Sequence, residues 1–262
     1  MTFYLVIIFL VGISIGSFLN VVIHRLPARG SLIHPPSHCP YCEQRLRFPE
    51  LLPLAGYLIY RKRCRYCQAP ISFRYFFVEL LTGLIFVSLF MRFGTDADLV
   101  KFALLFSLLL AISLIDLEHR IVPNPLVAFG LLAGIVFYLP HLINLVYHTP
   151  SAFMVSLPPA QALWGALLGG GSLLIVFLVS RGGMGAGDIK LMIMIGFYFG
   201  LLGTVAVLFF GFMIGALVGI AFMVLRKLTR KDALPFAPFL SLAALIQVFW
   251  GTAIWNWYLN LL

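Results

Sequence analysis

Acidic residues are scarce in this chain, and some of them lie in or at the edge of long apolar segments. The chain has 262 residues, of which nine are Asp or Glu. The acids in apolar surroundings are Glu79, Asp116, Glu118 and Asp188. An acid inside a membrane is costly and usually marks a functional site. Asp116 ends one apolar segment and Asp188 begins another, so this pair is the first candidate for chemistry.

Two close carboxylates that share a water molecule can hydrolyse a peptide bond. They cannot easily both ionise, so one keeps a proton while the other acts as a base toward the water. The activated water attacks the scissile carbonyl, and the protonated partner polarises that carbonyl and then protonates the leaving amine. Asp116 and Asp188 are our candidates for these roles. Gly185 and Gly187, just before Asp188, lack a Cβ and would let a substrate backbone come near.

Spacing alone leaves two other interpretations of these acids open. Both side chains can extend to the membrane interface and pair with the nearby Arg120 and Lys190. Intramembrane acids also serve as proton relays, so a proton-coupled transporter is the rival function.

All four cysteines lie in one basic segment as two Cys-x-x-Cys pairs. The pairs are Cys39 with Cys42 and Cys64 with Cys67. Four thiolates in this pattern suit tetrahedral zinc, and four protein ligands would make the metal structural rather than catalytic. The alternatives are two disulfides or unpaired thiols. Disulfides are disfavoured in the reducing cytoplasm, where the charge pattern described below places this segment.

Membrane helices must position these groups. The chain is 62% hydrophobic and 10% charged, with a mean hydropathy of +1.04, which excludes an ordinary soluble domain. Apolar runs of about 20 residues can cross a hydrocarbon core of about 30 Å as helices. Eight segments approach this length, at residues 3–23, 76–93, 100–115, 126–139, 160–179, 189–203, 204–225 and 238–261.

The predicted fold is all-α, a polytopic bundle of about eight transmembrane helices with a small cytoplasmic loop domain that binds zinc. Its expected parts are a first transmembrane helix at 1–23, the loop domain at 24–75 and a membrane core at 76–262. The loop is too short to be stabilised by a hydrophobic core of its own, so it needs a cross-link, which the cysteines supply. No internal repeat is expected. Glycines are expected to let helices approach closely at 165, 169, 170, 171, 211, 215 and 219.

The net charge of +9 does not indicate a nucleic-acid partner, because the basic residues follow a topological pattern. They concentrate in alternate loops, above all in residues 24–74, whereas Arg92 and Lys101 fall on the other side. The positive-inside rule then places the basic loops in the cytoplasm and both termini outside. On this threading Asp116 and Asp188 lie at the cytoplasmic side. We expect membrane lipid as a partner and no nucleic acid.

Six motifs, in order, resemble those of the type IV prepilin peptidases over nearly the whole chain. The Gly-x-Gly-Asp motif alone also resembles presenilin-type intramembrane proteases, but the ordered set is more specific. The motifs are GSFLNVVIHRLP at 16–27, the two cysteine pairs, ISFRY with VELL at 71–81, the segment around Asp116, GAGDIK at 185–190 and PFAPFL at 235–240.

This resemblance implies an activity and a location. It implies that Asp116 and Asp188 are the catalytic pair of an aspartic endopeptidase. The substrates would be type IV prepilins or type II secretion pseudopilins, cut after a glycine that ends a short basic leader. The protein would be a multi-pass protein of the bacterial inner membrane with its active site on the cytoplasmic side.

The resemblance also implies a second reaction. Such enzymes commonly methylate the new amino terminus with S-adenosylmethionine, and members with a cysteine loop tend to be bifunctional. Our candidates for binding that cofactor are Glu79, Gly16 and Asn20. The alternative is that these residues pack helices, with Glu79 paired to Arg74. No glycine-rich fingerprint after a predicted strand supports a soluble-type cofactor fold.

Two positions depart from the family pattern. Ala237 stands where glycine is usual, and Asn124 stands where aspartate is common. The first is expected to alter how closely the last span approaches the site, and the second to change only a cap or turn. Neither is expected to contact the proposed catalytic pair.

Overall fold

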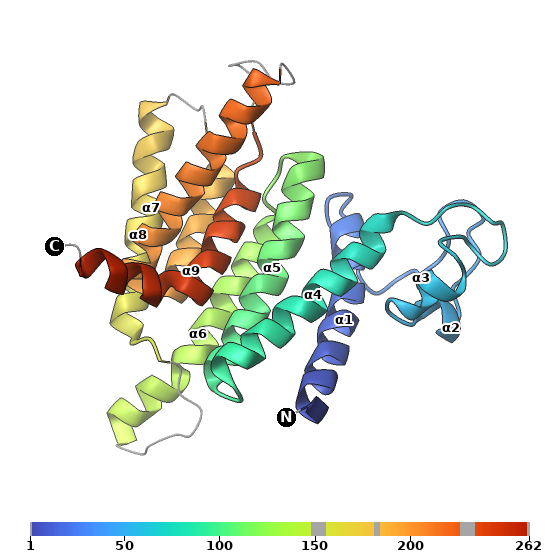
Figure 1. Cartoon of the computed structure of the whole chain (residues 1–262), viewed down its shortest axis with the longest axis horizontal. Coiled ribbons are helices and arrows are strands. Elements are labelled where there is room, and N and C mark those ends of the chain that lie inside the picture. The colour runs from blue at the N-terminus through green and yellow to red at the C-terminus, as the bar shows by residue number, and fades with distance from the viewer. Residues whose placement is uncertain (1, 148–155, 181–183, 226–233, 261–262) are drawn as a thin grey trace. The chain divides into compact units, whose positions relative to one another are not determined.

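The computed structural model describes residues 2–147, 156–180, 184–225 and 234–260, and in these residues the fold is all-helical, as predicted. Two isolated β-bridges in the loop after the first helix are the only extended pairing in these ranges. Two compact units make up the fold, unit 1 (Met1–Thr95) and unit 2 (Asp96–Leu262). The helices are α1 (Thr2–Arg25), α2 (Phe48–Leu51), α3 (Ala55–Ile59), α4 (Phe73–Phe93), α5 (Ala97–His119), α6 (Asn124–Tyr147), α7 (Pro159–Val179), α8 (Ala186–Val224) and α9 (Ala237–Leu259) (Figure 1).

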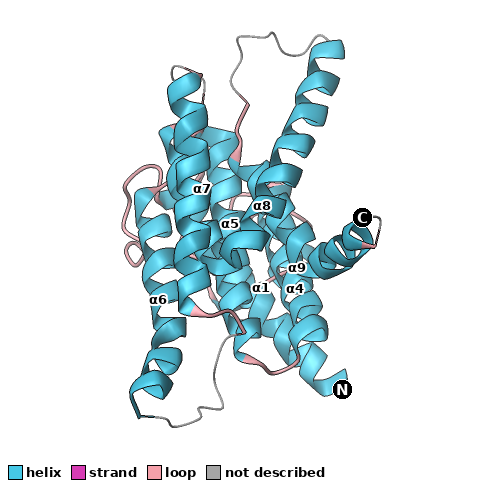
Figure 2. Cartoon of the chain, turned by 90° about the vertical axis from the view of Figure 1, so that its left-hand side faces the viewer, coloured by secondary structure: helices cyan, strands magenta, loops and turns pink. Residues whose placement is uncertain are grey.

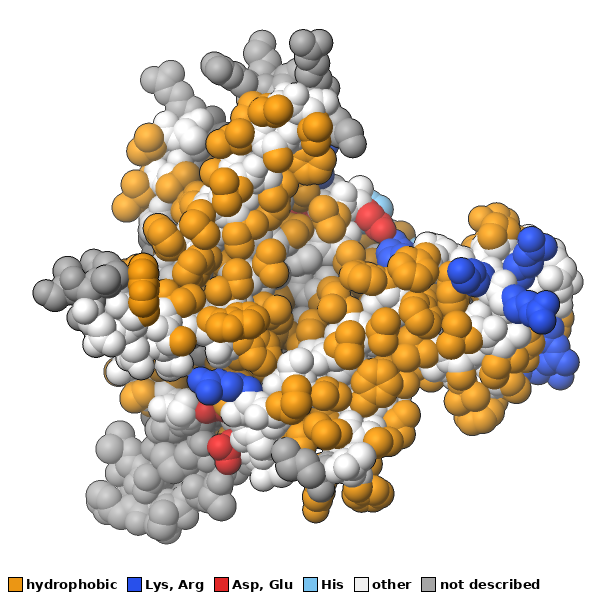
Figure 3. All heavy atoms as spheres, in the orientation of Figure 1, with side chains coloured by type: hydrophobic (Ala, Val, Ile, Leu, Met, Phe, Trp, Pro, Cys, Tyr) orange, Lys and Arg blue, Asp and Glu red, His pale blue; other side chains and the backbone are white. Residues whose placement is uncertain are grey.

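Six helices of the described residues are long and apolar enough to cross a membrane. They are α1, α4, α5, α7, α8 and α9, and apolar side chains cover much of their outer surface (Figure 3). The protein is therefore a multi-pass membrane protein. The expected count of eight spans is not confirmed, because the apolar stretch of α6 is short and two expected segments, 189–203 and 204–225, both lie in α8. The division into 1–23, 24–75 and 76–262 stays a prediction.

The long helix α8 changes direction at Gly200. The backbone there has φ 69° and ψ −173°, whereas the residues around it are helical. This region of conformational space is accessible essentially only to glycine. Two helical stretches therefore meet at Gly200, a few residues before the boundary expected from the sequence.

In unit 1, α1 and α4 pack closely and run in opposite directions. Gly12 lies beside Gly83, and Gly16 lies beside Glu79. A Cβ at Gly16 would lie 2.7 Å from the Cα of Glu79, so a larger residue would push the helices apart. α4 begins at a capped terminus, because the Ser72 side chain accepts the backbone N–H of Arg74.

In unit 2, α5 is the central helix, with α6 and α9 packed against it (Figure 2). Beside it, α7 and α8 pack backbone to backbone where Gly165 meets Gly196. The predicted close packing is confirmed for Gly165 and for two neighbours, Gly169 and Gly170. It is wrong for Gly171, which has open space beside it. The glycines at 211, 215 and 219 face residues at the start of α9 and just before it.

Candidate active site

Asp116 lies in the last turn of α5 and is buried, with 5% of its surface exposed. The helix ends one turn later at Arg120, which adopts the left-handed conformation with φ 55° and ψ 40°. The backbone N–H of Arg120 donates to the carbonyl oxygen of Asp116 at 2.8 Å. The chain therefore turns away from the helix axis one turn after the acid.

Asp188 lies in the first turn of α8 and is also buried, with 7% of its surface exposed. Its backbone N–H donates to the carbonyl oxygen of Gly185 at 3.0 Å. A Cβ at Gly185 would lie 3.2 Å from the Asp188 Oδ2 atom, so a side chain there would crowd the carboxylate. Helix N-termini attract negative charge, which favours an acid at this position.

The end of α5 and the start of α8 meet through the segment that follows Asp116. Gly187 contacts Val122, and a Cβ at Gly187 would lie 2.9 Å from the Val122 Cβ. The Lys190 Nζ atom donates to the Asn124 side-chain oxygen at the start of α6. As a result, the helix end that carries Asp116 and the helix start that carries Asp188 lie next to each other. The structure thus brings together the two acids that the sequence singled out.

The start of α9 completes the surroundings of Asp116. The backbone N–H of Ala237 donates to the Asp116 Oδ2 atom at 3.1 Å, and Ala237 itself is fully buried. The expectation that Ala237 does not contact the proposed pair was wrong. The PFAPFL motif at 235–240 is the one sequence feature that marks this contact. Its side chains do not predict the contact, because the donor is a backbone N–H group.

Two buried acids at the termini of packed helices can perform acid–base chemistry on a shared water. Because like charges at close range cannot easily both persist, such a pair holds one proton between its members. One member is then a base and the other an acid, which is the arrangement that peptide hydrolysis needs.

In unit 1, the structure brings together the three residues predicted to bind a cofactor. Glu79 is 8% exposed and Asn20 is 2% exposed, and Gly16 lies against the Glu79 backbone. The Asn20 Nδ2 atom donates to the carbonyl oxygen of Tyr75 at 3.0 Å, while its Oδ1 atom has no hydrogen-bond partner. The Glu79 carboxylate accepts a hydrogen bond from the Ser17 side chain. A buried carboxylate and an unpartnered amide oxygen together suit a ligand that carries hydrogen-bond donors or positive charge.

The loop before α3 also reaches Glu79. The backbone N–H of Leu54 donates to the Glu79 Oε2 atom at 2.7 Å. Leu54 has φ 59° and ψ −48°, and Ala55 donates its N–H to the Pro53 carbonyl oxygen, which makes a tight three-residue turn. Such strained turns are rare for a non-glycine residue and tend to occur at functional sites. No motif in the sequence indicated this contact.

The four cysteine sulfurs converge on one point. They all lie within 4.8 Å of one another, and the Cys39–Cys67 and Cys42–Cys64 sulfurs are 3.8 Å and 4.0 Å apart. These distances are too long for disulfides and match a tetrahedral site, in which zinc–sulfur bonds of about 2.3 Å place the sulfurs about 3.8 Å apart. Burial opposes ionisation of Cys39, but the N–H groups of Tyr41 and Cys42 and hydrogen bonds from neighbouring thiols outweigh it and lower the pKa of that thiol to about 7. The cluster fits a metal ion.

The two cysteine pairs belong to a repeated structure, so the expectation of no internal repeat was wrong for this loop. In the first copy, Cys39 donates its N–H to the Gln44 oxygen and accepts at its own carbonyl from Glu43. In the second, Cys64 makes the same two bonds with residues 69 and 68. The flanking bridges, His38 with Arg45 and Arg63 with Pro70, are also offset by 25 residues. We call each copy a knuckle (residues 37–46 and 62–71).

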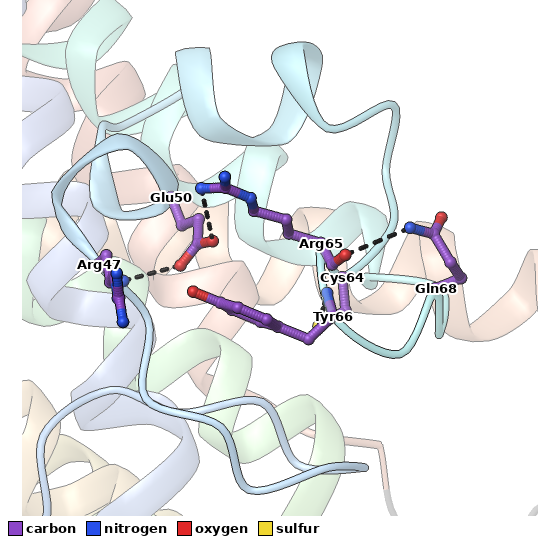
Figure 4. Close-up of polar contacts among 6 residues, drawn as sticks. All are labelled: Arg47, Glu50, Cys64, Arg65, Tyr66 and Gln68. Carbon is purple, nitrogen blue, oxygen red and sulfur yellow. Dashed lines mark hydrogen bonds and ion pairs between the residues drawn. The ribbon is translucent and has the colours of Figure 1, made fainter.

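Glu50 connects the two knuckles (Figure 4). Its Oε2 atom accepts the Arg47 backbone N–H at 2.7 Å, and its Oε1 atom lies 3.9 Å from the Arg65 guanidinium. Arg47 follows the first knuckle, whereas Arg65 lies within the second. The Glu50 side chain is 5% exposed and that of Arg65 is 54% exposed, so the carboxylate is buried while its ion pair with Arg65 is screened by solvent and contributes little.

Two protein families match this chain, one within each of the two units. Residues 10–93, within unit 1, match the family described as the bacterial peptidase A24 N-terminal domain. Residues 103–220, within unit 2, match the type IV leader peptidase family and include Asp116 and Asp188. The chain belongs to the type IV leader peptidase family. This confirms the resemblance found in the sequence motifs.

Three relatives match most of the chain in sequence, and each is named a prepilin leader peptidase/N-methyltransferase. The protein of Bacillus subtilis (strain 168) is 31% identical over 97% of this chain and 98% of its own length. That of Aeromonas hydrophila is 34% identical, over 98% and 94%. That of Myxococcus xanthus (strain DK1622) is 40% identical over 83% of this chain and 62% of its own length. No solved structure matches the chain.

Proposed function

We propose that this protein is a membrane-embedded aspartic endopeptidase that removes the leader peptide of type IV prepilins or type II secretion pseudopilins. We further propose that it methylates the new amino terminus. The observation that carries the first proposal is the pair of buried acids, Asp116 and Asp188, at meeting helix termini in unit 2. Membership of the leader peptidase family and the names of the relatives support both proposals.

In this mechanism Asp116 and Asp188 share one proton and one water. The ionised member removes a proton from the water, which attacks the carbonyl carbon of the scissile peptide bond. The protonated member donates a hydrogen bond to the carbonyl oxygen and afterwards gives its proton to the leaving amine. Gly185 leaves space beside Asp188, where a side chain would crowd the carboxylate. A substrate backbone can use that space.

For the second reaction, Glu79, Asn20 and Gly16 would hold S-adenosylmethionine, which supplies the methyl group when bound. The fit rests on the Asn20 Oδ1 atom, which is buried without a partner, and on the adjacent Glu79 carboxylate. Both are acceptors, and they suit the ammonium group of a methionine-derived cofactor. Gly16 keeps α1 close to α4 at this point.

The four cysteines would hold a structural zinc ion. Four protein sulfurs leave no open position for water, so the metal would fold the loop and take no part in either reaction. The loop lies between α1 and α4, and Lys and Arg side chains gather on it (Figure 3). This charge supports a location of the loop, and of the active site, on the cytoplasmic side of the bacterial inner membrane.

One experiment separates this function from a transporter. Detergent-solubilised protein is incubated with a prepilin, and the product is analysed by mass spectrometry. We expect a product shortened by its leader, with the added mass of one methyl group when S-adenosylmethionine is present. An uncut prepilin at high enzyme concentration would contradict the peptidase, and a cut but unmethylated product would contradict only the second activity.

A further inference from the structure

The contact between Ala237 and Asp116 follows from the way α9 begins. The first backbone N–H groups of a helix have no partner within the helix. Pro238 has no N–H, and the N–H groups of Phe239 and Leu240 both donate to the Phe236 oxygen, at 3.1 Å and 3.2 Å. Among these first residues of α9, Ala237 is thus the one whose N–H is directed at the carboxylate of Asp116.

A hydroxyl relay fixes the same residue from its carbonyl side. The Ser241 Oγ atom donates to the Ala237 oxygen at 2.8 Å, and the Ser113 Oγ atom donates to the Ser241 Oγ atom, also at 2.8 Å. Ser113 is buried on α5, one turn before Asp116. α5 therefore contacts Ala237 twice, once through the Asp116 carboxylate and once through the Ser113–Ser241 relay.

We propose that the first turn of α9 is a positioning element for the catalytic carboxylate of Asp116. The Ala237 N–H fixes Asp116 through Oδ2, and the Ser113–Ser241 relay keeps Ala237 in place. An amide N–H can only donate, so the Oδ2 atom must accept, and the Oδ1 atom is left for the water and the proton shared with Asp188. Donors already in place at a reacting group need no rearrangement during the reaction. This inference rests on the proposed peptidase function.

The matched pair Ala237→Pro and Ala237→Gly tests the backbone donor. Proline is well tolerated at the first position of a helix but has no N–H, whereas glycine keeps it. In prepilin cleavage we expect Ala237→Pro to lower kcat by about a hundredfold with little change in KM, since misplacing a reacting group costs about that much. Ala237→Gly, the conservative variant, should recover most of that loss. A wild-type kcat for Ala237→Pro, or a change confined to KM, would overturn the inference.

Ser241 supplies an independent test if the proline variant does not fold. Ser241→Ala removes the relay, and Ser241→Thr retains a hydroxyl. We expect Ser241→Ala to lower kcat about tenfold at unchanged melting temperature, and Ser241→Thr to recover it. Equal rates for the two variants would overturn the inference. Asp116→Asn is measured in the same assay to distinguish failure of this inference from failure of the proposed peptidase function. An active Asp116→Asn variant would reject the proposed catalytic pair itself.

Discussion

In unit 1 a loop reaches the buried acid Glu79, whereas in unit 2 the two proposed catalytic acids, Asp116 and Asp188, lie at the termini of helices. Glu79 accepts a hydrogen bond from Leu54, which lies in the loop held by the cysteines. Asp116 accepts one from the first residue of α9, and Asp188 sits in the first turn of α8. Sites on rigid elements are held more precisely than sites on loops. In unit 2 the positions of the two proposed catalytic acids are therefore set by helices. In unit 1 the site at Glu79 depends on a loop that the cysteine cluster holds in place.

The two proposed activities should therefore be separable. All four proposed zinc ligands and the Leu54 contact lie in unit 1, whereas both proposed catalytic acids lie in unit 2. Damage to the loop should therefore affect methylation first. Damage to the helix termini of unit 2 should affect cleavage first.

The largest effect is expected from Asp116→Asn and from Asp188→Asn. Each removes one member of the acid–base pair, so cleavage should fall by more than about a thousandfold. Methylation of an already shortened substrate should persist, because the acids lie outside unit 1. Product mass measures both activities, and an unchanged melting temperature controls for folding. Cleavage that survives either single change would eliminate the pair.

Removal of metal should produce the next largest effect. Binding of structural zinc contributes about 10 kcal/mol to folding of small metal-dependent segments, so a chelator should unfold the loop. We expect protease sensitivity within residues 26–72 and loss of methylation, with cleavage retained. Cys39→Ser should do the same, and Tyr41→Phe, which alters an exposed ring in the same knuckle, is the control.

Two results would contradict this prediction. An ordered loop in a fully metal-free sample would argue against the zinc site. Equal loss of cleavage would show that the loop also holds the substrate or the membrane core.

Replacement of Glu79 should weaken binding at the proposed cofactor site. Glu79→Gln removes a charged acceptor, which costs about 1.5–3 kcal/mol, or roughly 10- to 150-fold in the dissociation constant. Calorimetric titration with S-adenosylmethionine measures that change directly, without reliance on turnover. Ser88→Ala on the same helix is the control. Unchanged affinity in Glu79→Gln would remove Glu79 from the cofactor site.

A smaller effect is expected where α5 and α8 meet. Gly187→Ala places a Cβ against Val122 and should cost about 1–3 kcal/mol of stability through overpacking. Cleavage should fall with it, because the two acids are then displaced. Gly171→Ala adds the same atom where there is open space. If both variants melt alike, the Gly187–Val122 contact does not determine the approach of the two helices.

The smallest effect is expected from Asn124→Asp. Asn124 and Lys190 are both exposed, and the change converts their hydrogen bond into a surface ion pair. Such pairs contribute about 0.2–1 kcal/mol. The gain in melting temperature should vanish when Lys190→Ala is present. A gain that persists there would place its origin elsewhere.

Much of this site could be predicted because its residue types are costly in apolar surroundings. The burial of Asp116 and Asp188 follows from acids beside long apolar runs, and the cysteine cluster follows from paired Cys-x-x-Cys spacing. The all-helical fold follows from composition. These features depend on local sequence, so no partner segment had to be known.

The features that could not be predicted depend mainly on contacts between segments that are distant in the sequence. The Gly187–Val122 packing joins residues 65 positions apart, and the Ala237 N–H is a backbone group that any residue except proline would supply. The knuckle repeat was missed because its copies agree mainly in backbone hydrogen bonds. The number of spans was also not determined, because a single glycine bend inside α8 looks like a boundary between two segments.

Neither of the two knuckles can bind the metal ion alone. Each copy contributes two sulfurs, and half a cluster cannot complete a tetrahedral shell, so intermediates that lose one copy gain nothing from the other. Selection should therefore retain or discard the two knuckles together. Family members carrying two of these cysteines should be rare beside those with all four or none.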